Sequence, residues 1–366
     1  MVHILSHPLF WAISAFILVL GAVPPMMQCA PFLGLMDTPD KRKQHEGTIP
    51  LIGGLVILPV FMTLCLVSGH TWDSTWPLYS ALGLLLLTGA VDDKIHLHPL
   101  IKFSIQFIAA ALVVMPGGAQ LYQLGNLFGM GDVGLDSLSL PFSLISVVLL
   151  INAINLIDGL DGLAGGTVFI MTGWFLTACL LTSLAGALIF IPSLSILLGC
   201  LAGFLFYNIR SPWRKKAVIF MGDAGSMSLG LLMAWYAIHL SPEHRRVMEP
   251  ISVAWILALP IWDECAQFYR RVREGKHPFW PDRGHFHHHF ITAGLPPETA
   301  VRIILSLVFL SGGIGTFGLE IGLPLLLLTV SWIGFLLWHI GFSAKLDRYP
   351  AMIRKCRWLK TPSSAH

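Results

Sequence analysis

The sequence predicts an all-α, polytopic integral membrane protein with about eleven transmembrane helices. Hydrophobic residues make up 55% of its 366 residues, charged residues only 12%, and the mean hydropathy is +0.73. Apolar runs approach the roughly 20 residues that cross a bilayer. The expected spans cover residues 8–30, 50–69, 77–91, 99–116, 140–157, 164–183, 185–207, 226–240, 251–268, 299–317 and 322–342. The connections between them are too short for a separate core, so we expect one domain over residues 1–366.

The basic residues predict the orientation of the chain in the membrane. If the spans alternate in direction, 21 of the 23 Lys and Arg residues fall on one side, and only Arg245 and Arg246 fall on the other. The positive-inside bias makes the first side cytoplasmic. We therefore expect the N-terminus outside and a basic cytoplasmic tail over residues 343–366. This concentrated charge favours anionic lipid headgroups and anionic substrates as partners.

The remaining connections carry few chemical signals. The first apolar run is too long for a signal-peptide core and precedes a basic loop, so we expect it to stay as a helix. Alternating residues around 120–140 indicate a small outer hairpin. The six cysteines are scattered without a C-x-x-C pair, which predicts small buried side chains and no disulfide framework.

Two adjacent carboxylates, Asp92 and Asp93, lie where the third span reaches the cytoplasmic face. Such a pair is self-repulsive unless a cation, a metal-bound phosphate or a proton compensates it. The pair therefore predicts a metal or base site, although charged residues also flank many spans without further function.

A second group combines Asn152, Asn155, Asp158 and Asp161, which recur every three residues from the fifth span into the loop after it. On a helix this spacing forms one polar ridge. Polar side chains are costly in lipid, so the ridge must face a cavity filled with water or ligand.

Asp223 stands between glycines just before the eighth span, in the sequence Met221-Gly222-Asp223-Ala224-Gly225-Ser226. A carboxylate beside the free N–H groups of a helix start suits a metal ion that holds phosphate oxygens. Hard oxygen ligands favour magnesium or manganese over zinc.

A dense histidine run, His285, His287, His288 and His289, follows Asp282-Arg283. Histidines this close together are either transition-metal ligands or donors to phosphate. The carboxylates and amides elsewhere, and the lack of an H-E-x-x-H sequence, favour phosphate.

In this order the motifs resemble those of the polyprenyl-phosphate N-acetylhexosamine-1-phosphate transferases, over about residues 31–295. This family includes the phospho-MurNAc-pentapeptide translocase and the enzymes that start common antigen and O-antigen. Residues 37–47 and 49–54 resemble its substrate loop and the start of its second span. Asp282-Arg283 resembles the GlcNAc-1-phosphate branch, whereas Gly284 and the added His289 depart from the usual pattern.

The resemblance implies transfer of GlcNAc-1-phosphate from UDP-GlcNAc to undecaprenyl phosphate, with release of UMP. The reaction would take place at the cytoplasmic face of the bacterial inner membrane and supply the first lipid-linked sugar of O-antigen, common antigen or another cell-envelope polysaccharide. Mg²⁺ or Mn²⁺ is the implied cofactor. A UDP-sugar, polyprenyl phosphate and membrane lipids are the implied partners, and nucleic acid is not. The alternative donor is UDP-MurNAc-pentapeptide or another N-acetylated UDP-sugar.

The resemblance also implies roles for single residues. Asp223 and Asn155 would bind the metal, and Asp92 and Asp93 would be catalytic. The implied substrate-binding residues are Asp158, Asp161, His285, His287, His288, Arg283, Lys41, Arg42 and Lys43. The three basic residues of the first loop also fit a plain positive-inside loop.

Two roles stay open at this point. Asp92 either removes a proton from the acceptor or positions Lys94, Lys102 or the metal's water shell. Asp263, in the ninth span about two turns from Arg270, either supports the site or forms a structural pair with an Arg or Lys.

Two other classes fit less well. A secondary transporter would place its ionisable residues near the bilayer midplane, and an intramembrane metalloprotease would need zinc ligands within its spans. Here nearly all ionisable residues are expected at one face.

Overall fold

The computed structural model confirms that the chain is mostly helical. It describes residues 7–37, 47–69, 72–210, 214, 216–241, 247–277 and 284–356, with no side chains described for 72–74. Its α-helices are α2 (Pro8–Leu33), α3 (Gly53–Val67), α4 (Trp72–Ile95), α5 (Pro99–Val114), α6 (Ser139–Ile157), α7 (Leu163–Leu181), α8 (Phe190–Asn208), α9 (Gly222–Leu240), α10 (Pro250–Ile256), α11 (Ala258–Arg273), α12 (Phe286–Thr292), α13 (Pro297–Phe317), α14 (Leu325–Ser343) and α15 (Arg348–Lys355). Two short 3₁₀ turns, Asp136–Leu138 and Ala185–Ala187, and the strands β1 (Met36–Asp37) and β2 (Ile49–Pro50) complete the described elements.

Every expected span coincides with a helix, but the ninth is divided into α10 and α11. The break lies at Leu257, whose backbone angles are φ −91° and ψ 5°. Pro260 has no N–H to donate to the carbonyl of Ile256, and its ring crowds that carbonyl. The regular backbone hydrogen bonding of the helix is therefore interrupted there.

Six of the described helices are long and apolar enough to cross a membrane, while α3 and α5 are apolar but shorter. The chain is therefore a multi-pass membrane protein. The number eleven stays a prediction.

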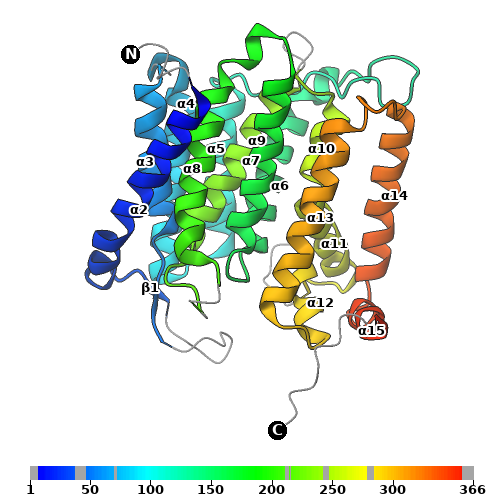
Figure 1. The fold of residues 1–366 in the computed structure, drawn as a ribbon. Coiled ribbons are helices and arrows are strands. Elements are labelled where there is room, and N and C mark those ends of the chain that lie inside the picture. The colour runs from blue at the N-terminus through cyan, green and yellow to red at the C-terminus, as the bar shows by residue number, and fades with distance from the viewer. Residues whose placement is uncertain are drawn as a thin grey trace.

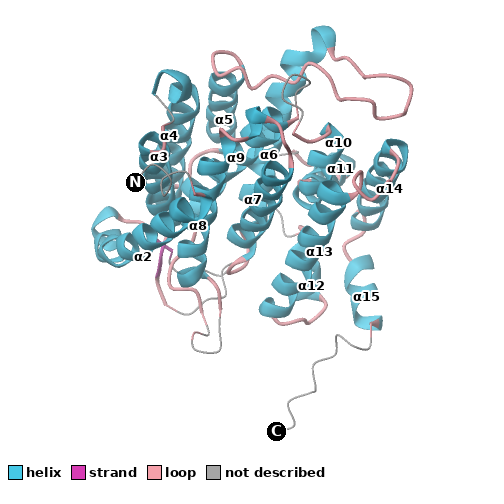
Figure 2. Ribbon diagram, turned by 45° about the horizontal axis from the view of Figure 1, so that its top comes forward, coloured by secondary structure: helices cyan, strands magenta, loops and turns pink. Residues whose placement is uncertain are grey.

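The long helices lie side by side as a bundle, with α2 beginning at the upper end in Figure 1 and α15 lying at the lower end. The same lower end carries β1 and α12 (Figure 1). Figure 2 shows helix throughout the bundle, with long loops across the upper end. The described chain thus begins and finishes at opposite ends of the bundle.

The surface of α2 shows how the bundle faces its surroundings. Trp11, Ala15 and Val19 recur every four residues and are buried, whereas Leu9 and Ile13 on another face are 62% and 56% exposed. A helix that is apolar on its outer face as well as its inner one suits lipid rather than water.

Small residues let α2 and α8 pack closely. Gly199 and Gly203 lie one helical turn apart on α8. A side chain at Gly199 would overlap the carbonyl of Ala12, and one at Gly203 would come to 2.8 Å from Cβ of Val19. This small-x-x-x-small arrangement lets two helix backbones approach closely. Such van der Waals packing drives helix association in lipid, because the hydrophobic effect does not act between helices there.

The loop before α6 confirms the small hairpin. The amide of Leu124 donates to the carbonyl of Val133 at 2.8 Å, and that of Leu135 donates to Tyr122 at 2.9 Å. The cysteines are free thiols, as expected, and Cys65, Cys179 and Cys200 are buried, whereas Cys29 and Cys356 are exposed.

Candidate active site

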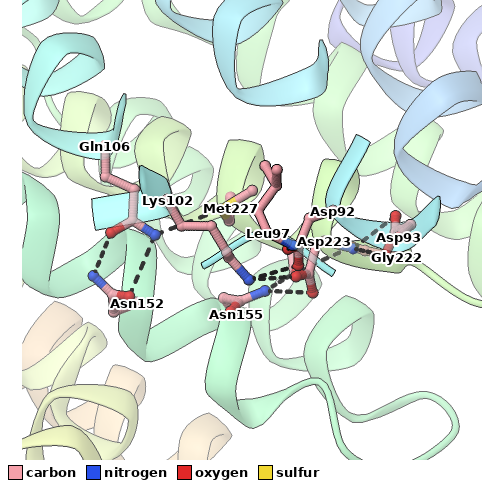
Figure 3. A network of polar contacts seen from close by, with 11 residues as sticks. Asp92, Asp93, Leu97, Lys102, Gln106, Asn152, Asn155, Gly222, Asp223 and Met227 are labelled. Atoms are coloured by element: carbon pink, nitrogen blue, oxygen red, sulfur yellow. Dashed lines mark hydrogen bonds and ion pairs between the residues drawn. The ribbon is translucent and has the colours of Figure 1, made fainter. Parts of the chain in front are cut away.

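The charged residues from three separate motifs meet at the lower end of the bundle. Asp92 and Asp93 come from the end of α4, Asn155 from the end of α6, and Asp223 from the start of α9. Figure 3 shows Asp92, Asn155 and Asp223 near the end of the Lys102 side chain of α5, with Asp93 further away beside Gly222. Helices α4, α5 and α6 pack in sequence, and α9 packs on both α4 and α6, so these distant motifs converge.

Lys102 is the cation at the centre of the cluster. Its Nζ lies 2.9 Å from Oδ2 of Asp92 and 2.5 Å from Oδ2 of Asp223. Asp92 is 8% exposed, and its other oxygen accepts the backbone N–H of Leu97 at 2.6 Å. The ammonium group therefore pairs with two carboxylates from different helices.

Sequence reasoning considered Lys102 only as a residue that Asp92 might position. The position of Lys102 near the start of an apolar span could have identified it as a site residue, because a lysine there is costly in lipid unless it is paired.

Asp93 anchors the beginning of α9. Both of its carboxylate oxygens accept the backbone N–H of Asp223, at 3.0 and 3.1 Å. Gly222 has φ +72°, and a side chain there would meet Oδ2 of Asp93 at 2.6 Å. A carboxylate at a helix N-terminus is favourable because the first N–H groups have no partner within the helix.

Asn152 and Asn155 of the predicted polar ridge lie on α6, but the helix ends at Ile157, so Asp158 and Asp161 lie in the turn after it. Asn155 donates from Nδ2 to Oδ1 of Asp223 at 3.0 Å and to Oγ of Ser226 at 2.9 Å. One turn earlier, Asn152 donates to Oε1 of Gln106 at 2.7 Å and receives a bond from Gln106 Nε2 at 3.3 Å (Figure 3). These amide pairs set the register of α5 and α9 against α6.

Asp158 lies directly after α6, at its C-cap. Removal of its carboxylate from water raises the pKa of Asp158 to about 8, and the negative charges of Asp223, Asp93 and Asp161 raise it further. The side chain keeps partial access to solvent. The described part of the site therefore has an excess of negative charge.

Asp161 is engaged by the protein itself. Its Oδ2 accepts Nε of Arg210 at 2.7 Å and the backbone N–H of Ala217 at 3.3 Å. Arg210 also pairs with Glu298 at 2.9 Å. Asp161 thus joins the loop after α6 to the ends of α8 and α13, and a contact with substrate stays a prediction for it.

The histidine run forms the start of α12, with His285 as its N-cap. His287 is 2% exposed, and within the described chain neither of its ring nitrogens has a hydrogen-bond partner. Burial, and then the charge of His288, lower the pKa of His287 to about 3. His287 is therefore neutral near pH 7 and offers a polar ring to a ligand.

The histidines also lie beside the carboxylate loop. A side chain at Gly159 would overlap Nε2 of His287, so His287 rests directly on the backbone after Asp158. The rings of His287 and His288 are 4.1 Å apart, and those of His285 and His287 are 6.0 Å apart.

Several predicted residues fall outside the described chain. They are Lys41, Arg42, Lys43 and Arg283. The ends of the first loop are described: β1 pairs antiparallel with β2, with Met36 opposite Pro50. Phe220 donates to the carbonyl of Pro50 at 2.8 Å, which places this loop's base beside the start of α9.

The donor set fits a magnesium ion shared with substrate. In the described residues no three His, Cys, Asp or Glu side chains form a ready-made metal cage, and the histidine run is no exception. Magnesium seldom uses such cages, because one or two carboxylates and the substrate's phosphates hold it. Asp223 and the amide oxygen of Asn155 offer the hard oxygens, and the ammonium group of Lys102 is shared between the carboxylates of Asp92 and Asp223.

The chain is similar in sequence to known proteins. Residues 75–241 match the family described as glycosyl transferase family 4, which covers the carboxylates of α4, the ridge of α6 and the start of α9. An undecaprenyl-phosphate alpha-N-acetylglucosaminyl 1-phosphate transferase of Haemophilus influenzae is 33% identical over 310 residues, 84% of this chain and 86% of that protein.

Proteins of the same name from other bacteria have a similar sequence identity to this chain. The one from Yersinia pestis is 30% identical over 78% of this chain and 77% of its own length. The one from Escherichia coli K12 is 32% identical over 77% of this chain and 76% of its own length. The chain therefore belongs, with these transferases, to glycosyl transferase family 4.

Proposed function

We propose that the chain transfers GlcNAc-1-phosphate from UDP-GlcNAc to undecaprenyl phosphate and releases UMP. The observation that carries the proposal is the cluster of Asp92, Lys102, Asn155 and Asp223 at one end of an apolar bundle. A lipid phosphate and a water-soluble nucleotide can meet only at a membrane surface. The names of the relatives give the same sugar and the same lipid.

In this reaction an oxygen of the lipid phosphate attacks the sugar-bearing phosphorus of UDP-GlcNAc. The bond from that phosphorus to the bridging oxygen breaks, and UMP leaves with the electron pair. Both reactants are anionic, so catalysis depends on positioning and on positive charge. Lys102, which already spans two carboxylates, is the nearest described cation to the site.

Asp223 and Asn155 would hold Mg²⁺, with Mn²⁺ as a substitute. The ion supplies positive charge to the diphosphate when bound. Asp93 keeps the start of α9 in place through the N–H of Asp223, and Asn155 orients the carboxylate of Asp223 by donating to it.

Asp92 acts in this proposal by positioning Lys102 rather than by removing a proton. Its Oδ2 pairs with Lys102 and its Oδ1 accepts the N–H of Leu97, so Asp92 ties the ammonium group of α5 to the end of α4. The second pKa of a phosphate monoester is near 6, so the acceptor is largely a dianion at neutral pH and needs little help from a base.

The remaining residues would recognise the donor. Asp158 and Asp161 would contact uridine or sugar, and His287, His288 and Arg283 the diphosphate or sugar. The sequence also assigned His285 to this role, but both of its ring nitrogens are engaged by Asp263 and Arg271. Lys41, Arg42 and Lys43 would attract the anionic substrates. The product would be the first lipid-linked sugar of a cell-envelope polysaccharide such as O-antigen or common antigen.

The proposed setting is the bacterial inner membrane, crossed eleven times, with the N-terminus outside and the active site facing the cytoplasm. The charge distribution supports this orientation, because only Arg245 and Arg246 of 23 basic residues fall on the other side.

Incubation of the purified protein with undecaprenyl phosphate and one UDP-sugar at a time tests the donor. We expect mass spectrometry to find undecaprenyl diphosphate carrying GlcNAc, and no product from UDP-MurNAc-pentapeptide. The variant Asp223→Asn, which loses the metal-binding charge, should give none. Product from a different UDP-sugar alone would refute the assignment to GlcNAc.

The variant Asp92→Asn tests the role of that carboxylate. We expect a loss of rate on the order of a hundredfold, as for a misplaced catalytic group, and a mutant-to-wild-type ratio that is flat between about pH 6 and 8, since a positioning role does not follow the acceptor's second pKa. The rates are measured with saturating substrates and magnesium. A ratio that climbs steeply with pH would instead identify Asp92 as the base.

Single cysteines in a background without the native cysteines test the orientation. Met130→Cys replaces a side chain that is 88% exposed at the upper end, and Lys276→Cys replaces an exposed one after α11. We expect a membrane-impermeant thiol reagent to label residue 130 in intact cells, and residue 276 only after permeabilisation. The reverse pattern would place the active site outside.

A further inference from the structure

The Asp263 carboxylate lies inside the bundle, 4% exposed, and binds the beginning of α12. Its Oδ2 lies 3.2 Å from Nδ1 of His285, and its Oδ1 accepts the backbone N–H of Phe286 at 3.0 Å. Oδ1 also accepts Nε2 of Gln267, one turn along α11, at 3.0 Å. These partners differ from the Arg or Lys that the sequence suggested as its structural pair.

The surroundings of His285 determine which nitrogen carries its proton. Nε2 of His285 lies 3.4 Å from a guanidinium nitrogen of Arg271. A guanidinium group has donors only, so Nε2 must accept and the proton must lie on Nδ1. His285 then donates that proton to Asp263, and the protein itself engages both ring nitrogens.

The chain before His285 is held from the same helix. The carbonyl of Gly284 accepts Nε2 of Gln267 at 2.8 Å and a guanidinium nitrogen of Arg270 at 3.3 Å. A side chain at position 284 would overlap the Arg270 guanidinium. This explains the glycine where the family resemblance led us to expect a polar residue.

The C-terminal helices support the same carboxylate from the other side. Nε2 of His339 on α14 lies 3.9 Å from Oδ1 of Asp263, and the Tyr349 hydroxyl on α15 is 2.7 Å from Nδ1 of His339. The Tyr349 ring is 5.3 Å from that of Phe286. Asp263 is thus the junction of α11, α12 and α14.

The consequence of this anchoring is the placement of His287. His287 is one turn or less from the two residues that Asp263 holds, it rests on Gly159, and its buried ring nitrogens have no partner in the described chain. A shift of the first turn of α12 would move His287 away from the loop that carries Asp158.

We propose that Asp263 is a positioning residue for sugar-phosphate transfer. By accepting the ring Nδ1–H of His285 and the backbone N–H of Phe286 it fixes the first turn of α12. It thereby holds the His287 ring against the carboxylate loop, ready for the UDP-sugar. This inference rests on the proposed function and adds a residue to its donor site.

A double-mutant cycle tests the proposal. Asp263→Asn should lower kcat/KM for the UDP-sugar roughly ten- to a hundredfold, the loss typical of groups that orient functional histidines, and leave the KM of the lipid acceptor unchanged. His287→Ala should cause a similar loss. In the double variant the losses should not multiply, because Asp263 acts through His287. Multiplying losses would overturn the proposal.

Two further comparisons separate positioning from folding. Trp262→Phe alters the neighbouring residue of α11, whose ring packs on Trp332 and Phe335, and should leave kcat/KM unchanged. If Asp263→Asn does not fold, His285→Asn and His285→Gln replace it. Asn can keep the donor at the Nδ1 position and should retain several-fold more activity than Gln. Equal losses for both would contradict the role of Asp263.

The donor used in these assays is whichever UDP-sugar the wild-type protein accepts. A wild type that accepts another sugar would refute the assignment to GlcNAc while the cycle still reports on Asp263. A wild type that forms lipid product normally, together with multiplying losses in the cycle, would refute only the role of Asp263.

Discussion

The bridge from Lys102 to Asp92 and Asp223 is the interaction on which the rest of the site depends. Carboxylates at the end of an apolar bundle are costly to ionise, and close carboxylates repel one another. Lys102 joins two of them across α4, α5 and α9. The amide of Asn155 also donates to Asp223, and the backbone N–H of Asp223 donates to Asp93. One ammonium group thus faces two carboxylates, and the negative charges of Asp223 and Asp93 add to the effect of burial in raising the pKa of Asp158. A site of this kind is prepared for a divalent cation and for the basic residues that accompany anionic substrates.

Much of the fold and several members of the site could be predicted from the sequence. Hydropathy located the long helices but not the short α12 and α15, because length and apolarity decide which segments can cross a membrane. The carboxylate pair, the ridge of α6 and Asp223 could be singled out because polar side chains near lipid are energetically costly and are therefore often functional. The break at Leu257 could have been expected from Pro260, yet proline is tolerated in many membrane helices. The pairing of Asp161 with Arg210 depends on how α8 ends against α6, which no local pattern specifies.

In the histidine run, residue types alone did not distinguish the structural histidine from those that face the ligand. The sequence grouped His285 with the other histidines as substrate ligands. In the fold His285 contacts Asp263 and Arg271, whereas His287 is buried against Gly159 without a partner in the described chain. The C-terminal helices gave no motif, but His339 and Tyr349 support this segment. Tertiary contacts therefore divide one motif into residues that hold the segment and residues that face the ligand.

The most direct test of the role of Lys102 is the effect of magnesium on the stability of Lys102→Met, with Lys102→Arg as the matched control. If Lys102 compensates the carboxylates that also attract the metal, its removal should lower the melting temperature in chelator, and added Mg²⁺ should restore it. The same variant should bind Mg²⁺ more tightly than the wild type, by roughly tenfold or about 1.4 kcal/mol, because no ammonium group competes for Asp223. The arginine variant, which keeps the charge, should behave much like the wild type. Equal destabilisation with and without Mg²⁺, together with unchanged or weaker Mg²⁺ binding, would contradict this view of the site.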